Sequence, residues 1–384
     1  MLTRMGETVI RCTRGTTHNL CRKRKRGLRS RASFFSLNAP LLLLSLALVA
    51  KRVHTFASHG TSMVAALSRR APPTKGDSFS QPKSADRDNV VGSRFRVLPD
   101  GKIFSSGKSV VRDGIAIDGV AAPLKLKFFN SASAAAADRE LDNLEALRRG
   151  VGPSQFQRSF VGAVTVIRDH QRAGQHVLVM EAGTSDLLHH IERTGPVGGR
   201  ELRRWARATA TVLTVIHRTG LIWTDLKPEN LVLMTDGKTV KAIDLESAVR
   251  AGAAPVDCSP AVAPPEAALA YRRGPADVRV DAAYDAWSLG MTLLHLKVGK
   301  SYWEHRFGIR GNGGNAQQIM QELCRPDFTV DLSCLDEIGN SIKGGKAEAE
   351  PQLRTLLAGL LSSDPRRRVA ALRTPSWYLN GPML

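Results

Sequence analysis

The chain has 384 residues, of which 42% are hydrophobic and 23% are charged, so it carries enough apolar side chains for a sizeable core. This composition excludes wholesale disorder, collagen-like repeats and a multi-pass membrane protein. Lys and Arg outnumber Asp and Glu by 55 to 35, and a net charge of +20 would ordinarily indicate nucleic acid or an anionic membrane as a partner.

Most of this charge lies in the first fifth of the sequence. Residues 1–75 contain fifteen Lys or Arg and a single acid, Glu7, whereas the remaining residues contain 40 basic and 34 acidic side chains. The basic signal therefore belongs mainly to a leader, residues 1–76, and we predict no nucleic-acid partner for the folded part.

The leader contains a mostly apolar run at residues 39–50, preceded by the basic stretch 22–26. A membrane-spanning helix needs about 20 apolar residues, and counting from Phe34 to residue 50 gives only 17. The run is typical of a signal peptide, and the acid-free stretch 53–75 is typical of a transit peptide.

Three interpretations of the leader remain open. It resembles the two-part plastid leaders of algae with secondary plastids, with Phe56 near the junction of the two parts. A signal anchor in the secretory pathway is the second interpretation, and it would restrict membrane contact to residues 34–50. A nuclear signal at residues 22–26 is the third, and a wrongly assigned start codon is an alternative to all of them.

The five cysteines lie at positions 12, 21, 258, 324 and 334 and form no CxxC pair. This spacing indicates neither a zinc ribbon nor a disulfide scaffold. We expect the three cysteines beyond the leader to be unpaired thiols.

Four polar residues stand out in the middle of the chain. Two apolar runs flank an Asp-Gly turn at residues 235–238, which predicts a short hairpin. Asp225, Lys227 and Asn230 precede this turn and Asp244 follows it, so the hairpin would bring the four side chains together.

Such a set suits phosphoryl transfer, which requires the positioning of charge more than covalent chemistry from the protein. A carboxylate, Asp225, would accept the hydroxyl proton of a substrate, and the cation of Lys227 would offset charge on the phosphoryl group. The amide of Asn230 and the carboxylate of Asp244 would hold Mg²⁺.

The hexapeptide Asp-Leu-Lys-Pro-Glu-Asn at residues 225–230 resembles the catalytic loop of the eukaryotic protein kinase family, in its Ser/Thr branch. The alternative is a chance match, with Asp225 opening a turn and Pro228 ending a helix. The resemblance implies an α+β, two-lobed fold with a mainly β small lobe at 92–181 and a mainly helical large lobe at 182–380. It also implies ATP and Mg²⁺ as cofactors and a protein substrate.

Further residues match the small lobe of this family in order. The alternating stretch 124–129 predicts a strand on which Lys127 resembles the lysine that contacts ATP phosphates, with Lys125 as an alternative on the same face. Residues 134–149 have the apolar spacing of a helix, and Glu140 matches the glutamate that pairs with the strand lysine. Both residues also fit ordinary solvated positions.

Residues 176–183 resemble the last strand of the small lobe and the hinge. The resemblance implies that Met180 is the gatekeeper and that backbone groups of Glu181 and Ala182 face adenine. A plain buried strand explains the same apolar run.

In the large lobe, the resemblance implies that Ser259 touches the catalytic Asp and Lys. It also implies that Asp285 accepts backbone amides of the catalytic loop and that Glu266 pairs with Arg368. Trp377 matches the closing aromatic residue of the fold.

The chain departs from the family at the nucleotide loop, where no GxGxxG can be formed between residues 95 and 127. Gly107 is the best candidate for this loop, and an ordinary hairpin turn is the alternative.

Two other departures concern the activation segment. Leu245 and Glu246 follow Asp244 where Phe and Gly are usual, and losing Gly restricts the backbone there, so we expect an ordered, active-like Asp244. Trp223 and Thr224 replace His and Arg, which removes the usual partner of an activation-segment phosphate. We therefore expect activity that does not depend on phosphorylation of this segment.

The leading hypothesis is an active Ser/Thr kinase. A pseudokinase acting as an ATP-binding or protein-interaction module is the alternative suggested by the altered loop and by Glu246. A kinase of small molecules is a third hypothesis. It is less favoured than a protein kinase, because Ser259, Glu266 and Asp285 resemble a protein-substrate platform that small-molecule kinases lack.

Overall fold

The computed structural model describes residues 89–106, 108–118, 122–169, 175–257, 259–274, 277–308, 316–339 and 350–373. The leader, Gly107, Cys258 and Trp377 lie outside the described residues, so the predictions made for them are not addressed by the structure.

The small lobe is built on a seven-stranded antiparallel sheet in the order β1-β2-β4-β5-β7-β6, with β3 also paired to β4. Alternation of apolar and polar residues explains the central strands, because one face of the sheet is buried. The strands are β1 (Val90–Val91), β2 (Phe95–Val97), β3 (Ile103–Ser105), β4 (Ser109–Ala116), β5 (Leu124–Phe129), β6 (Ala163–Asp169) and β7 (Gln175–Glu181).

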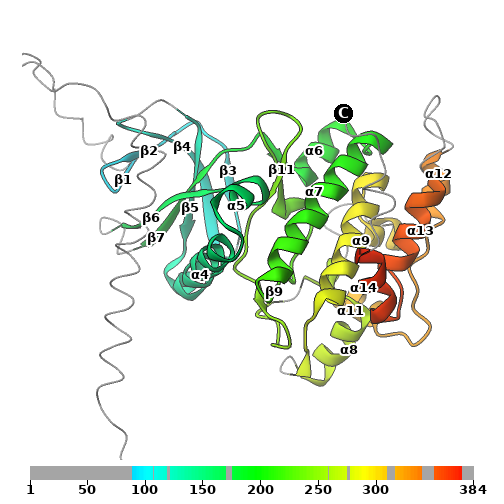
Figure 1. Cartoon of the computed structure of the whole chain (residues 1–384). Coiled ribbons are helices and arrows are strands. Elements are labelled where there is room, and N and C mark those ends of the chain that lie inside the picture. The colour runs from blue at the N-terminus through cyan, green and yellow to red at the C-terminus, as the bar shows by residue number, and fades with distance from the viewer. Residues whose placement is uncertain are drawn as a thin grey trace, which may run out of the picture. The chain divides into compact units, whose positions relative to one another are not determined.

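Two helices lie beside this sheet (Figure 1). The longer, α4 (Ala134–Val151), buries residues at helical spacing, including Ala137, Glu140, Leu144 and Leu147. It ends at Gly152, whose φ is +79°, and the adjoining Pro153 starts α5 (Pro153–Ser159). Short 3-10 helix η1 (Ser131–Ser133) leads into α4.

The large lobe is mainly helical. Its helices are α6 (Leu187–Thr194), α7 (Gly199–Arg218), α8 (Pro265–Arg273), α9 (Ala282–Val298), α10 (Tyr302–Phe307), α11 (Ala316–Leu323), α12 (Cys334–Gly339), α13 (Glu350–Leu360) and α14 (Pro365–Arg373). Its short strands are β8 (Ser185–Asp186), β9 (Leu221–Ile222), β10 (Leu231–Leu233), β11 (Val240–Ala242) and β12 (Val249–Arg250), and its 3-10 helices are η3 (Pro228–Asn230) and η4 (Pro260–Val262).

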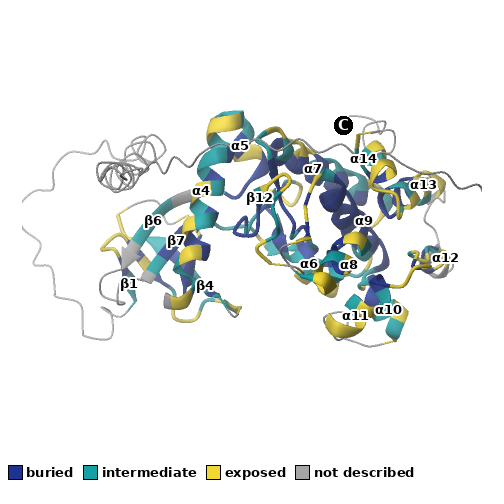
Figure 2. Ribbon diagram, turned by 90° about the horizontal axis from the view of Figure 1, so that it is seen from below, coloured by how far each residue is buried: buried dark blue, intermediate teal, exposed yellow. Residues whose placement is uncertain are grey.

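Helix α9 lies at the centre of this lobe, as its dark colour in Figure 2 shows. All its residues except Ala282 and His295 are buried, because other helices cover every side of it. Gly290 allows the close approach of α13, since a Cβ there would lie 2.7 Å from Leu361. None of the helices in the described part of the chain combines the length and the apolar character needed to cross a bilayer.

The hairpin predicted around the Asp-Gly turn is confirmed. Strands β10 and β11 pair with Leu231 opposite Ala242 and Leu233 opposite Val240. Asp236 stabilises the turn by accepting the backbone N–H groups of Lys238 and Thr239, each at 2.8 Å. The hairpin therefore carries residues 225–230 and Asp244 at the same end.

Cys324 and Cys334 are buried, and neither forms a disulfide within the described residues, as expected for these two cysteines.

Candidate active site

Asp225 lies at the centre of a hydrogen-bonded group between β9 and β10. Its carboxylate accepts from Lys227 Nζ at 2.9 Å and from Ser259 Oγ at 2.5 Å, and Lys227 Nζ also donates to Ser259 Oγ at 3.2 Å. Asn230 Nδ2 donates to the backbone oxygen of Asp225 at 2.8 Å and to its carboxylate at 3.0 Å. These bonds fix the orientation of the carboxylate, and Ser259 makes both of the contacts that the resemblance implied.

A second group crosses the cleft between the lobes. Lys127 Nζ on β5 donates to Glu140 Oε2 on α4 at 2.8 Å and to Asp244 Oδ1 at 3.0 Å. Lys127 and Glu140 are buried, whereas the side chain of Asp244 remains 34% exposed and is therefore open to a ligand. The alternative lysine, Lys125, pairs with Asp113 instead, at 2.5 Å.

Burial and neighbouring charges shift the pKa values of Lys127 and Glu140 in opposite directions. Burial alone would lower the pKa of Lys127, but the carboxylates of Glu140 and Asp244 outweigh it and raise the pKa well above its usual range. Burial raises the pKa of Glu140 to about 7, because this carboxyl is fully enclosed and also faces Asp244, and Lys127 only partly opposes the shift. Lys127 therefore keeps its charge at any physiological pH.

Trp223 and Thr224, which stand where the family has His and Arg, hold the start of the activation segment. Trp223 Nε1 donates to the backbone oxygen of Asp244 at 3.2 Å. Thr224 Oγ1 donates to the backbone oxygen of Ser247 at 3.0 Å, and Ser247 Oγ donates to the oxygen of Trp223 at 3.1 Å. The two bonds with Ser247 are buried and the bond to Asp244 is partly buried, and together they support the left-handed conformation of Asp244, with φ of +59°.

Asp285 on α9 supports the catalytic loop through hydrogen bonds to its backbone. Its carboxylate accepts the backbone N–H groups of Trp223 and Thr224, each at 2.9 Å, and lies 2.8 Å from His217 Nε2. Asp285 is fully buried, so these partners satisfy a carboxylate that would otherwise be costly to enclose. The predicted contact between Asp285 and the loop amides is confirmed.

Helix α4 also reaches the activation segment directly. Asn143 Nδ2 donates to the backbone oxygens of Leu245 at 2.8 Å and Ala248 at 2.9 Å, and Arg139 Nε donates to that of Glu246 at 3.3 Å. The segment is thus held from both lobes at once. Positive φ values occur at Asp244 and Thr224, not at Glu246, so the residue that replaces Gly imposes no left-handed backbone.

Lys108 joins the nucleotide loop to the activation segment. Its Nζ lies 2.8 Å from Glu246 Oε1 and 2.9 Å from Asp257 Oδ2. Burial alone would lower the pKa of Lys108, but these two carboxylates raise it. The altered loop and the Glu that replaces Gly are therefore in contact, and we call this contact the Lys108 bridge.

The stretch predicted to be the nucleotide loop lies between β3 and β4. Ser106 Oγ accepts the backbone N–H groups of Lys108 at 3.3 Å and Ser109 at 3.1 Å. In glycine-rich loops, such amides face the phosphates. Here a serine side chain engages them.

The hinge follows β7. Met180 is buried, and the backbone N–H groups of Glu181 and Ala182 donate to the oxygens of Gly162 at 3.3 Å and Pro123 at 3.2 Å. Gly183 lies against β10 so closely that a Cβ would meet Val232 at 2.2 Å. Within the described residues its N–H has no acceptor, which leaves it as the donor for a ligand at the hinge.

The oxygen donors of the cleft fit a hard cation. Carboxylate oxygens of Glu140, Asp244 and Glu246 lie within 4.8 Å of one another. Lys127 engages Glu140 and Lys108 engages Glu246, whereas Asp244 gives only Oδ1 to Lys127 and is partly exposed. The other carboxylate oxygen of Asp244 and the side-chain oxygen of Asn230 are therefore the groups suited to Mg²⁺.

A fully buried arginine, Arg368, pairs with the half-exposed Glu266 in the large lobe. Arg368 Nη2 donates to Glu266, and its other nitrogens donate to the backbone oxygens of Ala283 at 3.1 Å and Ser362 at 2.9 Å. The predicted pairing of Glu266 with Arg368 is confirmed.

The structure thus brings together Asp225, Lys227, Asn230, Asp244, Lys127 and Glu140. Met180 and Glu181 end β7 and Ala182 follows, but the N–H groups of Glu181 and Ala182 bond to backbone oxygens and are therefore not available to adenine. Sequence reasoning missed Lys108, Asp257, Asn143 and Gly183. The unpaired acid at position 246 was a signal that a cation would lie nearby, but no spacing in the sequence links it to Lys108.

Comparisons with known proteins agree with this geometry. The profile of the family described as protein kinase domain matches residues 157–375. Serine/threonine-protein kinase STK11 of Rattus norvegicus is 28% identical over 234 residues, which cover 58% of this chain and 46% of the relative, and its Mus musculus counterpart matches equally. STK11 of Gallus gallus is 29% identical over 175 residues, which cover 43% of this chain and 33% of the relative.

The chain therefore spans less than half the length of these curated relatives. The match to the family profile covers more than half of this chain, and the sheet, the helical lobe and the residues across the cleft have the arrangement of that family. On these grounds, this chain belongs to the protein kinase family.

Proposed function

We propose that the chain is an active serine/threonine protein kinase that transfers the γ-phosphate of ATP to a hydroxyl group of a protein substrate. The observation that carries the proposal is the paired arrangement across the cleft, with Asp225 held by Lys227 and Asn230 on one side and Asp244 held by Lys127 on the other.

Asp225 supplies the proton acceptor. The oxygen of the substrate hydroxyl forms a bond to the γ-phosphorus, the bond from that phosphorus to the ADP oxygen breaks, and the hydroxyl proton moves to the Asp225 carboxylate. Lys227 keeps its charge, since Asp225 outweighs burial and raises the pKa of the lysine. Its ammonium would therefore offset the negative charge of the phosphoryl group during transfer.

Lys127 and the two residues suited to a metal supply the remaining positioning. Lys127 would contact the phosphates of ATP, with Glu140 holding the lysine in place. Asn230 and Asp244 would hold Mg²⁺, which when bound neutralises charge on the phosphates. The hinge N–H of Gly183 would donate a hydrogen bond to a ring nitrogen of adenine, beside the Met180 side chain.

We also propose that activity does not require phosphorylation of the activation segment. The hydroxyls between Asp244 and Glu266 belong to Ser247 and Ser259, and both are engaged, the first with Trp223 and the second with Asp225. The Lys108 bridge and Asn143 hold the segment by other means.

The competing candidate is a pseudokinase that serves as a protein-interaction module. The observation in its favour is the nucleotide loop, in which Ser106 engages two amides and Lys108 is paired with Glu246. Such a loop offers fewer free donors to phosphate.

A radiolabelled ATP assay on the full chain separates the two candidates. Label should pass to a general protein substrate, the transfer should fall by at least about a thousandfold in Asp225→Ala and Asp244→Ala, and phosphatase treatment of the parent should leave it unchanged. Transfer that survives both substitutions, or no transfer despite measurable binding of Mg-ATP, would overturn the proposal of an active kinase.

A further inference from the structure

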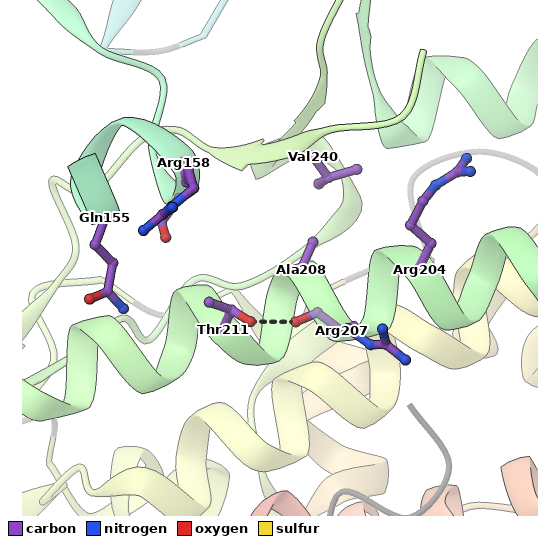
Figure 3. A pocket seen from close by; sticks show the side chains of 8 residues that line it. Gln155, Arg158, Arg204, Arg207, Ala208, Thr211 and Val240 are labelled. Carbon is purple, nitrogen blue, oxygen red and sulfur yellow. Dashed lines mark hydrogen bonds between the residues drawn. The ribbon is translucent and has the colours of Figure 1, made fainter. Parts of the chain in front are cut away.

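The outer face of α7 borders two adjoining hollows. The first has a volume of about 310 Å³ and lies between α5, α7 and β11, and its lining includes Arg158 of α5 and Arg204 and Arg207 of α7 (Figure 3). The second has a volume of about 500 Å³ and lies between α7 and α14. The two hollows share Arg207 and Thr211, so they form one groove along the helix.

The arginine side chains that line this groove give it a positive charge. The lining includes Arg158, Arg204, Arg207, Arg218 and Arg373, and no residue that lines either hollow is an Asp or Glu. We call it the arginine groove.

Several of these charges are available to a ligand. The side chains of Arg158, Arg218 and Arg373 are exposed and make no hydrogen bond or ion pair within the described residues. Arg204 is partly neutralised by Glu201, at 3.1 Å on the same helix. Because one of these unpaired arginines lines the first hollow and two line the second, their spread favours an extended anionic ligand over a single ion.

The floor of the groove favours a polypeptide among anionic ligands. Thr211 Oγ1 donates to the oxygen of Arg207 at 2.9 Å, and Thr214 Oγ1 donates to that of Ala210 at 2.8 Å. Each hydroxyl hydrogen is therefore used within the helix, and the oxygen lone pairs that remain can accept backbone N–H groups of a peptide. A DNA backbone has no such donors, and an RNA backbone offers only its 2′-hydroxyls.

The length of the groove suits a short segment. The distance from Arg204 to Arg218 along a helix is about 21 Å, at a rise of 1.5 Å per residue. An extended chain covers that distance in about six residues. The leader of this protein cannot be the occupant on grounds of charge, because residues 1–75 carry fifteen basic side chains and one acid.

We propose that the arginine groove docks an extended segment of a partner protein that is rich in Asp and Glu. The groove shares no residue with the catalytic group around Asp225, so docking goes beyond the proposed kinase activity and does not depend on it.

Binding and crosslinking on the full chain test this proposal. The probe is an eight-residue peptide of alternating Asp and Ser that carries fluorescein and a benzophenone crosslinker, and the matched peptide has Asn in place of Asp. We expect saturable binding of the Asp peptide only, with crosslinks on α5, α7 or α14. Binding should weaken as NaCl is raised, because exposed charges are screened.

Charge reversal provides the matched variants. Arg158→Glu combined with Arg218→Glu should lower the affinity for the Asp peptide at least tenfold. Arg272→Glu combined with Arg273→Glu makes the same change of charge on exposed, unpaired arginines of α8, and should alter binding less than twofold. Equal thermal unfolding midpoints would show that both double variants are folded. Asp225→Ala should bind the peptide like the parent, so loss of catalysis and loss of docking are measured separately.

Four results would overturn the proposal. They are the absence of saturable binding, equal weakening by both double variants, crosslinks confined to the leader, and tighter binding of a single-stranded oligonucleotide or of phosphatidylserine vesicles at the groove. The last result would assign the groove to nucleic acid or membrane instead.

Discussion

Thr224 shows how a single replacement in the catalytic loop is tolerated. It is a β-branched residue with φ of +67°, a conformation that such residues rarely adopt. Its N–H donates to Asp285 and its hydroxyl donates to Ser247, and the side chain is fully buried. The conformation persists because these bonds over-determine it.

Removing the Thr224 hydroxyl should therefore destabilise the protein. We expect Thr224→Val to lower the free energy of unfolding by about 1–3 kcal/mol, because the buried oxygen of Ser247 loses its donor. Turnover should fall as well, since Ser247 follows Asp244 closely. Thr224→Ser keeps the hydroxyl and is the control. Urea titrations measure the free energy of unfolding, and a parental value for Thr224→Val would contradict this role of the hydroxyl.

His295 on α9 should make stability sensitive to acid. Burial lowers its pKa from 6.5 to about 4, with Glu304 opposing the shift. Because the folded-state pKa is below the unfolded one, the stability from keeping this imidazole neutral is complete above pH 6.5 and is lost as the pH falls toward 4.

Between pH 7 and pH 5 this group should cost the parent about 2 kcal/mol of unfolding free energy. The loss should be absent from His295→Leu, whose stability should change less over the same interval. Urea titrations of both proteins at the two pH values measure the difference, and parallel losses would show that His295 does not contribute.

At the scale of elements, the Lys108 bridge connects the β3–β4 loop with the activation segment. The side chain of Lys108 is 41% exposed and that of Asp257 is 61% exposed, whereas that of Glu246 is 10% exposed. Exposed pairs contribute little, so the contact with Glu246 should dominate.

We expect Lys108→Met to lower turnover about threefold to tenfold, because it removes a contact that holds the segment carrying Ser259. Proteolysis within residues 247–257 should become faster in the same variant. Lys108→Arg should retain most of the activity, and Lys102→Met is a control in the same β-hairpin. Unchanged proteolysis in Lys108→Met would show that the bridge does not order the segment.

At the scale of the whole molecule, Arg368 ties three helices of the large lobe together. It is fully buried on α14, its guanidinium reaches Glu266 on α8 and Ala283 on α9, and it lies 5.6 Å from the ring centroid of Trp287. Loss of this side chain would leave several buried polar groups without a partner.

Arg368→Met should lower the free energy of unfolding by about 1–3 kcal/mol for each backbone oxygen, of Ala283 and of Ser362, that loses its donor. Arg367→Met changes the exposed neighbour in the same helix and should alter stability by less than about 0.5 kcal/mol. Denaturant unfolding measures both, and a similar effect of the two substitutions would be evidence against the buried network.

The leader lies outside the described residues, and its role as a plastid address, with the secretory or anchored alternatives, stays a prediction. Mass spectrometry of the protein isolated from its own cells measures the mature N-terminus. A terminus within residues 50–90 would support a cleaved leader, and a terminus at Met1 would contradict it.

The sequence by itself determined the family resemblance, the hairpin and the residues at its end. Asp225, Lys227 and Asn230 lie within six positions, and Asp244 follows one hairpin later, so local geometry brings them together. The lysine and glutamate of the small lobe could be assigned because a regular strand and a regular helix present them in order, although the choice between Lys125 and Lys127 required the structure.

Only the tertiary structure decided how the unusual residues are accommodated. Lys108 and Glu246 are 138 positions apart and pair because the two lobes close on each other. Trp223 and Thr224 hold the activation segment by bonds to backbone oxygens, and such bonds leave no trace in residue type. The arginine groove likewise arises from helices far apart in the chain. Spacing in a sequence reports contacts along one element, whereas contacts between elements depend on how the whole chain packs.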